Sequence, residues 1–317
     1  MHYVNVLWIE HFDDSRVAMF RNVKDAASRS RGVFLAESEL VISRVFDTGF
    51  TAQALLVSES RFARMATRIH EAQAAQVSQV SLRSLLPQAS QFKPTQALGR
   101  DPGFEVFVCE QSTLEAIVGF PLHRGCLAIC YRQGLPTPQE LLARAQTVVV
   151  LDDVVDPDNI GSVFRHVAGF GLDGVVLSAN AGDPLYRKSI RASMGWVLEV
   201  PYARLPNRDS LLPTLHDAGF KTIALTPRRD APTLRSVVGS LLPTDRVAFL
   251  LGAEAPGLPD QTISGATYQA RITMTMHVDS FNVATAGALA LYELTAAHPN
   301  RIVQRNAPPE FPASTAD

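Results

Sequence analysis

The sequence predicts an α/β protein built around a parallel β-sheet, and residues 148–177 give the clearest indication of it. Val148–Leu151 is aliphatic and uncharged, as in a strand that is buried on both faces. Asp156 and Pro157 follow the strand and end it, since proline lacks the amide that a strand ladder needs. Gly174–Leu177 has the pattern of a second strand. We therefore expect a βαβ unit with polar residues at the carboxyl end of its first strand, where open α/β sheets bind ligands.

Between these strands the apolar residues recur at helical spacing, so the sequence predicts a helix with Asp158 or Asn159 as its N-cap. The predicted apolar face consists of Ile160, Val163, Phe164, Val167 and Phe170. Gly169–Gly174 matches the glycine pattern G-x-G-x-x-G, but the match follows a helix and opens a strand. A dinucleotide site requires the opposite order, so we interpret these glycines as a helix stop and a turn.

Composition indicates an ordinary globular chain. Of the 317 residues, 46% are hydrophobic and 19% are charged, which suits two domains with ample cores. The net charge of −2 gives no global nucleic-acid signal, so any RNA contact must use local patches. Cys109, Cys126 and Cys130 lack metal-ligand spacing and suggest a reducing compartment. We find no signal-peptide or membrane-helix pattern and expect a cytoplasmic protein with no membrane contact.

The first part of the chain alternates strands and helices, which predicts a small α/β sandwich. The predicted strands are Gly32–Glu37, Gln53–Val57, Gln76–Val80, Glu105–Cys109 and Gly125–Tyr131. The predicted helices are Asp14–Ala27, Ser38–Phe46, one from about Arg61, and Thr113–Val118 with Ser112 as its cap. Basic residues near the N-terminus form either a solvated helix face or a phosphate contact. These are Arg16, Arg21, Lys24, Arg29 and Arg31.

Gln133–Pro138 has the composition of a linker, and a second α/β part follows it. Beyond the βαβ unit, its predicted strands are Val197–Val200, Lys221–Thr226, Arg246–Leu251 and Ala270–Thr273. Its predicted helices are Pro184–Met194, Asp209–Ala218 and Ser280–Thr295. From Pro299 the chain is rich in proline, serine and alanine, and we expect it to be disordered.

Three motifs in the second part carry candidate chemistry. The first is DPDNIGSVFR, where Asn159 at the helix start and Arg165 differ by about 240° around the helix. The carboxylates that accompany it lack a metal-ligand pattern, so we interpret them as solvated. These are Asp152, Asp153, Asp156 and Asp158.

The second motif, LLGAEAPGL, places Glu254 between Gly252 and Gly257, whose backbones can approach a ligand closely. In the third, DSFNVATAGALALYE, Ser280 is the predicted helix cap and Asn282 lies in the first turn. A helix start offers free amides to an electron-rich group.

Taken together, the three motifs resemble the SpoU (TrmH-like) branch of the SPOUT RNA methyltransferases. The resemblance covers about Val148–Thr295, in the expected order, and Thr273 departs from the proline common there. Gly32–Val41 and His123–Ile129 resemble, more weakly, the family's substrate-binding domain of ribosomal-protein L30e type. The domain prediction is residues 1–132 for substrate binding, 133–145 as linker, 146–298 as methyltransferase and 299–317 as tail.

The resemblance implies a deep trefoil knot in the methyltransferase domain, a homodimer, and S-adenosylmethionine as cofactor without a metal. It implies methyl transfer to a ribose 2′-hydroxyl of structured RNA, with ribosomal RNA favoured over transfer RNA. The implied catalytic residues are Asn159, Arg165, Glu254, Ser280 and Asn282. The implied cofactor-binding residues are Gly252, Ala253, Glu254, Gly257, Ile272, Met274, Phe281 and Asn282.

Two other classes remain open at this point. A Rossmann-type oxidoreductase or other nucleotide enzyme is disfavoured by the misplaced glycine pattern. An RNA-binding or ribosome-assembly protein of the same fold that has lost catalysis is disfavoured by the five polar candidates. The sequence does not identify the RNA, the modified nucleotide or the proton acceptor.

Overall fold

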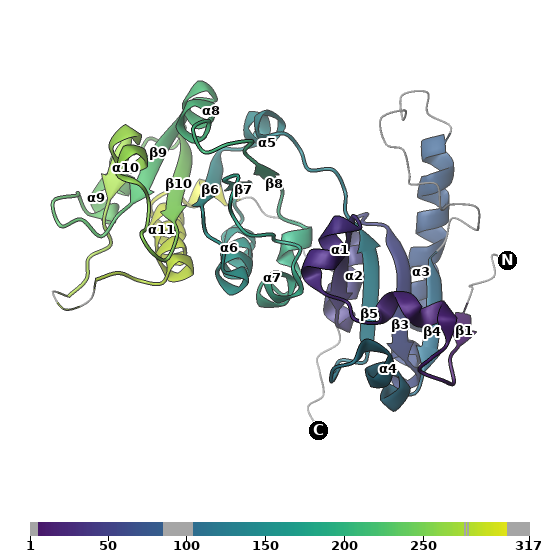
Figure 1. Cartoon of the computed structure of the whole chain (residues 1–317). Helices are drawn as coiled ribbons and strands as arrows, with labels where there is room; N and C mark the ends of the chain where they lie inside the picture. The colour runs from purple at the N-terminus through teal and green to yellow at the C-terminus, as the bar shows by residue number, and fades with distance from the viewer. Residues whose placement is uncertain (1–5, 85–103, 276, 278, 303–317) are drawn as a thin grey trace. The chain divides into compact units, whose positions relative to one another are not determined.

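The computed structural model describes residues 6–84, 104–275, 277 and 279–302. The chain divides into two compact units (Figure 1). Unit 1 comprises Met1–Gly134 together with Asp183–Glu199, and unit 2 comprises Leu135–Gly182 and Val200–Asp317. Most of the tail that was expected to be disordered, residues 303–317, lies outside the described residues.

Unit 1 contains a five-stranded mixed sheet of order β1-β4-β3-β5-β2, in which β5 runs antiparallel to both of its neighbours. The strands are β1 (Val6–Trp8), β2 (Val33–Glu37), β3 (Ala52–Ser58), β4 (Glu105–Cys109) and β5 (Cys126–Tyr131). Its helices are η1 (Ser15–Phe20), α1 (Asp25–Ser30), α2 (Glu39–Asp47), α3 (Glu59–Ser84), α4 (Gln111–Val118), α7 (Arg187–Ala192) and η2 (Trp196–Leu198). Because β2, β3 and β4 run in the same direction, their carboxyl ends share one edge of the sheet.

Four predictions for unit 1 are corrected by the structure. Gln76–Val80 is not a strand but part of α3, where the Gln76 amide bonds to both backbone groups of Ala52 at 3.0 Å. Ser112 is not a cap, since α4 begins at Gln111. The segment predicted as one helix, Asp14–Ala27, contains η1 and the start of α1, separated by extended backbone at Arg21.

The fourth correction concerns Val197–Val200, which was predicted as a strand. Trp196–Leu198 instead forms the 3-10 helix η2, after Gly195 with φ +85°. Val197 and Leu198 are buried there. A short apolar run indicates burial but does not by itself distinguish a strand from a helix turn.

Unit 2 contains a six-stranded, entirely parallel sheet of order β11-β9-β10-β6-β7-β8. The strands are β6 (Thr147–Asp152), β7 (Gly174–Leu177), β8 (Tyr202–Arg204), β9 (Phe220–Leu225), β10 (Arg246–Gly252) and β11 (Tyr268–Ala270). Its helices are α5 (Pro138–Arg144), α6 (Pro157–Gly169), α8 (Leu211–Asp217), α9 (Leu234–Gly239), α10 (Asp260–Gly265), α11 (Val283–Ala297) and η3 (Pro299–Arg301). The predicted parallel α/β architecture is confirmed, whereas the trefoil knot stays a prediction.

Both faces of this sheet are covered, which explains the uninterrupted apolar runs at residues 148–151 of β6 and 247–251 of β10. One face packs Val148, Val150 and Leu250 into a core with residues of α5, α8 and α10. On the other face α11 lies against β10 and α6. Gly287 permits this approach, because a Cβ there would lie 2.9 Å from Cδ1 of Leu251.

The glycine-rich match between α6 and β7 is a helix stop and a turn, as expected. α6 ends at Gly169, Gly171 adopts φ +65°, and Gly174 starts β7. α5 covers residues 138–144 of the segment 133–145 that was predicted as a linker, and a Thr137–Glu140 capping box begins it. No helix of the described residues is long and apolar enough to cross a membrane.

Candidate active site

The three sequence motifs meet at the carboxyl edge of the unit 2 sheet. β6 and β10 are neighbours, and their last residues, Asp152 and Gly252, are paired in register. β7 and β8 continue the sheet on the β6 side, whereas β9 and β11 extend it on the β10 side. The strand order thus diverges between β6 and β10, and such a point in an open α/β sheet leaves a crevice for a ligand.

The first motif begins α6. Asp156 is its N-cap, not Asp158 or Asn159 as predicted: the Asp156 Oδ1 accepts hydrogen bonds from the amides of Asp158 (2.8 Å) and Asn159 (3.1 Å). Pro157 takes the first helical position, where its missing amide costs nothing. This arrangement leaves the Asn159 side chain, half-buried, free to bond elsewhere.

The second motif follows β10 and folds back tightly over the strand end. A Cβ on Gly252 would lie 2.2 Å from the Leu258 amide nitrogen and 2.4 Å from the Gly257 carbonyl carbon, so only glycine fits there. Gly257 adopts φ +83°, which also favours glycine. The two glycines therefore fix the loop that presents the exposed Glu254.

The third motif leads into α11, and its cap differs from the prediction. Asn282, not Ser280, is the N-cap: its Oδ1 accepts from the amides of Ala284 (2.9 Å) and Thr285 (3.2 Å). Ser280 and Asn282 are both favourable caps by residue type, so the sequence pattern alone did not separate them.

Hydrogen bonds join three of the predicted catalytic residues into a chain, one from each motif. The Asn282 Nδ2 donates to the Asn159 Oδ1 at 2.8 Å, and the Asn159 Nδ2 donates to the Glu254 Oε1 at 2.5 Å. We call these three residues the amide relay. Its direction is fixed at both ends, since the helix amides hold the Asn282 oxygen and a carboxylate can only accept.

The other two predicted catalytic residues, Arg165 and Ser280, do not join the relay. Both are exposed, and in the described part of the chain neither side chain makes a hydrogen bond or ion pair. Arg165 lies on α6 beyond Asn159, as its spacing requires. Burial, and then the charge of Arg165, lowers the pKa of the adjacent His166, which favours the neutral imidazole there.

The sequence suggested that the acidic residues at the end of β6 are solvated, but the structure shows that two of them pair with an arginine. Asp152 is fully buried and pairs with Arg208 (Nη2 to Oδ2, 3.2 Å), which also approaches Asp153 at 3.3 Å. Burial raises the pKa of Asp152, and the charge of Arg208 opposes that shift. Arg208 carries no motif signature and was missed, because it lies 56 positions from its partner. Within the described residues no group of His, Cys, Asp and Glu could hold a metal ion.

The structure places the predicted cofactor residues at the end of β10, in the loop that follows it, and in the coil between β11 and α11. Ala253 lies in the loop after β10, and Ile272 and Met274 lie in the coil that follows β11, where both are half-buried. Phe281, just before the α11 cap, exposes 39% of its surface. Apolar side chains that are only partly covered remain available to contact a ligand.

Comparison with known proteins supports one family. The family model described as the SpoU rRNA methylase family matches residues 146–292. An uncharacterized tRNA/rRNA methyltransferase of Mycobacterium bovis is 33% identical over 288 residues, which is 89% of each chain. A Mycobacterium tuberculosis relative of the same description matches equally well.

Solved structures show the same fold at lower identity. An rRNA methyltransferase from Sinorhizobium meliloti, solved with AdoMet bound, gives a TM-score of 0.72 at 21% identity, covering 92% of this chain and 98% of that one. The SpoU methyltransferase AviRb from Streptomyces viridochromogenes, in complex with AdoMet, gives 0.66 at 19%, covering 90% and 100%. With its motif order, its parallel sheet and these relatives, the chain belongs to the SpoU rRNA methylase family.

Proposed function

We propose that this protein is an S-adenosylmethionine-dependent methyltransferase that modifies a ribose 2′-hydroxyl of structured RNA, with ribosomal RNA as the substrate class. The observation that carries the proposal is the amide relay, which joins one side chain from each motif by hydrogen bonds of 2.8 and 2.5 Å. A chain kept only for binding RNA would have no need of such a hydrogen-bonded polar group.

The residues that would hold the cofactor surround the strand ends of β10 and β11. They are Gly252, Ala253, Glu254, Gly257, Ile272, Met274, Phe281 and Asn282. The glycines offer backbone groups at close range, and the apolar side chains offer contact area. When bound, the cofactor supplies a methyl group that its sulfonium already activates, so the reaction needs no metal.

The chemistry requires the 2′-oxygen to form a bond to the methyl carbon while the carbon–sulfur bond breaks and the hydroxyl proton leaves. A ribose hydroxyl is a weak nucleophile, so the protein must position it. We assign this task to the amide relay and Ser280. We assign Arg165 to the substrate phosphate or hydroxyl, since a guanidinium stays protonated and acts by positioning and charge.

The names of the relatives support RNA as substrate, and the family description favours ribosomal RNA. The proposal also includes a homodimer, a substrate-binding domain over residues 1–132 and a methyltransferase domain over 146–298. These assignments follow from the family resemblance, and the small-residue helix α11 suits close packing.

The direct test maps ribose 2′-O-methylation in total RNA from a parent strain and a deletion strain. We expect one or a few ribosomal RNA positions to lose methylation on deletion, to regain it with the wild-type gene, and not with Asn159→Ala. Calorimetry adds a second readout: S-adenosylmethionine and S-adenosylhomocysteine should bind, and NAD should not. Identical methylation maps, or binding of NAD alone, would reject the proposal.

A further inference from the structure

Five arginines lie along the carboxyl edge of the unit 1 sheet, and the proposed function gives them no role. We call Arg61, Arg64, Arg124, Arg187 and Arg191 the arginine strip. Arg61 and Arg64 lie in the first turns of α3, Arg124 lies in the turn between α4 and β5, and Arg187 and Arg191 lie on α7. Segments that are distant in the sequence thus contribute to one edge.

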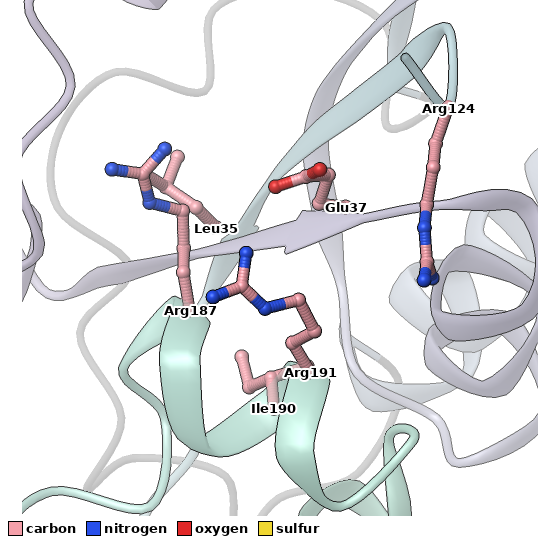
Figure 2. Close-up of a pocket in the computed structure, with 6 residues that line it drawn as sticks. All are labelled: Leu35, Glu37, Arg124, Arg187, Ile190 and Arg191. Atoms are coloured by element: carbon pink, nitrogen blue, oxygen red, sulfur yellow. The ribbon is translucent and has the colours of Figure 1, made fainter. Parts of the chain in front are cut away.

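Three arginines of the strip line one hollow together with Leu35, Glu37 and Ile190. These arginines are Arg124, Arg187 and Arg191. Figure 2 shows the Glu37 carboxylate with Arg187 and Arg191 on one side and Arg124 on the other. Arg187 and Arg191 are four residues apart, so both project from the same face of α7. One carboxylate among three guanidinium groups leaves an excess of positive charge.

Two of these arginines have no side-chain partner among the residues that the structure describes. Among the described residues, the exposed side chains of Arg124 and Arg191 make no hydrogen bond or ion pair. Arg187, by contrast, approaches Asp25 (Nε to Oδ1, 3.6 Å) and lies over the Phe120 ring at 4.9 Å. Unpaired guanidinium groups at a surface are suited to bind phosphate oxygens, which they can contact through two parallel bonds.

The other two arginines of the strip, Arg61 and Arg64, line an open cavity of about 480 Å³. Its lining is polar and consists of Ser58, Ser60, Arg61, Arg64, Gln111, Glu115 and His123. Arg61 and Arg64 each approach the Glu39 carboxylate only at 3.6 Å, so neither is tightly held. Hydroxyl, amide and guanidinium donors therefore face the same hollow.

The turn His123–Gly125 joins the two hollows. His123 lines the second and Arg124 the first. Gly125 follows with φ +63°, and a Cβ there would lie 2.7 Å from the Ser58 Oγ and 2.9 Å from the Arg61 Cγ. The close approach that glycine permits brings the start of α3 beside the turn, so the strip is continuous.

Three of the five basic residues near the N-terminus, which the sequence offered as a phosphate contact, have partners within unit 1. Arg16 pairs with Asp14 at 2.6 Å. Arg21 donates to two backbone carbonyls at 2.8 Å, and Arg29 approaches the buried Asp183 at 3.5 Å. These contacts hold unit 1 together and leave the arginine strip as the better phosphate surface.

We propose that the arginine strip binds the phosphate backbone of the RNA substrate, with Arg124 and Arg191 as its principal contacts. The inference rests on the proposed function for the identity of the polyanion as RNA. The inference adds that α7 contributes to substrate binding, although α7 lies within residues 146–298, the predicted methyltransferase domain. A protein of net charge −2 needs such a local surface, since its overall field does not attract RNA.

The test compares two triple variants of the full-length protein that each remove three positive charges from unit 1. The strip variant carries Arg64→Ala, Arg124→Ala and Arg191→Ala, and the control variant carries Arg16→Ala, Lys24→Ala and Arg31→Ala. The probe is a fluorescein-labelled RNA hairpin, and its Kd is measured by anisotropy from about 50 to 200 mM KCl. S-adenosylmethionine affinity and Tm are measured on the same samples.

We expect the strip variant to reduce the slope of log Kd against log salt by about 2 to 3, because each lost phosphate contact removes roughly 0.7 to 0.9. The control should keep the wild-type slope, and cofactor affinity should stay unchanged in both. A wild-type slope in the strip variant, or an equal reduction in the control, would overturn the inference. If the triple variant does not fold, Arg191→Gln alone should reduce the slope by about 0.7 to 0.9.

Separate measurements test the arginine strip and the proposed function, so either one can be rejected without the other. Transfer of labelled methyl groups to ribosomal RNA by the wild-type protein tests the function without reference to the strip. An active wild-type enzyme with an unaltered strip variant rejects only the strip. An inactive wild-type enzyme rejects the function, while the hairpin slopes still decide whether the strip binds RNA.

Discussion

Replacing Asn282 with aspartate should disable the amide relay while leaving the α11 cap intact. Aspartate caps a helix as well as asparagine does, and its charge is favourable at a helix N-terminus. One carboxylate oxygen can therefore replace the Asn282 Oδ1 that accepts from Ala284 and Thr285 at 2.9 and 3.2 Å. The second oxygen, however, would face the Asn159 Oδ1, which now accepts from Nδ2 at 2.8 Å.

Rotation of the Asn159 side-chain amide cannot restore both hydrogen bonds of the relay. Turning the Asn159 side chain would satisfy the new carboxylate but would point the Asn159 oxygen at Glu254, which now accepts at 2.5 Å. In either orientation one of the two hydrogen bonds is lost, about 1 to 1.5 kcal/mol for exposed side chains, and two oxygen atoms are left facing each other, about 1 kcal/mol more. The sum of about 2 to 2.5 kcal/mol corresponds to a loss of roughly 30- to 70-fold in kcat/KM.

Asn282→Ser is the matched control, because serine caps the helix but neither donates to Asn159 nor adds charge. It should lose only the neutral bond, about 1 kcal/mol, or roughly 5-fold in kcat/KM. The assay is steady-state methyl transfer to RNA, with Tm measured in parallel and expected to change little in either variant. Activity of Asn282→Asp that equals or exceeds that of Asn282→Ser would refute the directional relay.

Arg165→Ala should bind S-adenosylmethionine nearly normally in calorimetry but lose roughly 10²-fold or more in methyl transfer, because the arginine serves the RNA; Arg165→Lys tests whether charge alone suffices, and wild-type turnover in the alanine variant would remove Arg165 from the mechanism. Gly252→Ala should reduce cofactor affinity at least 10-fold and lower stability by about 1–3 kcal/mol, since its Cβ would strike backbone 2.2 Å away; an unchanged Kd would contradict the proposed loop. Burial raises the pKa of Cys109 and of Cys126 to about 12, so a thiol reagent at pH 8 should label them only after unfolding in denaturant. The fragment 138–317 should retain cofactor binding and lose most RNA affinity, because it keeps Arg187 and Arg191 but lacks the other three arginines of the strip; full methylation of native RNA by the fragment would show that the first domain is not the substrate reader.

Much of unit 2 was predictable because its signals are local. The buried run of β6, the proline that ends it and the helical spacing of Ile160, Val163 and Phe164 all act within a few residues. The three motifs likewise follow strand ends or helix starts. Parallel strands must bring those points to one edge, so the motifs could be expected to meet.

The N-cap residues of α6 and α11 could not be predicted from local sequence alone. Asp156, Asp158 and Asn159 all suit an N-cap, and so do Ser280 and Asn282. The choice depends on where the preceding strand or coil delivers the chain, and on whether a side chain has another partner. Asn159 is held by the relay, which the sequence does not show.

The sequence by itself determined the βαβ unit, the misplaced glycine pattern, and the order of three motifs that belong to one family. Only the tertiary structure decided that Asp152 is buried with Arg208, that Asn282 points at Asn159, and that Asp183–Glu199 belongs to unit 1. The physical reason is the separation in sequence between the residues that interact. Periodicity and capping depend on neighbours within a turn or two, whereas the contacts of Asp152 with Arg208 and of Asn159 with Asn282 join residues 56 and 123 positions apart, once packing has closed the loops between them.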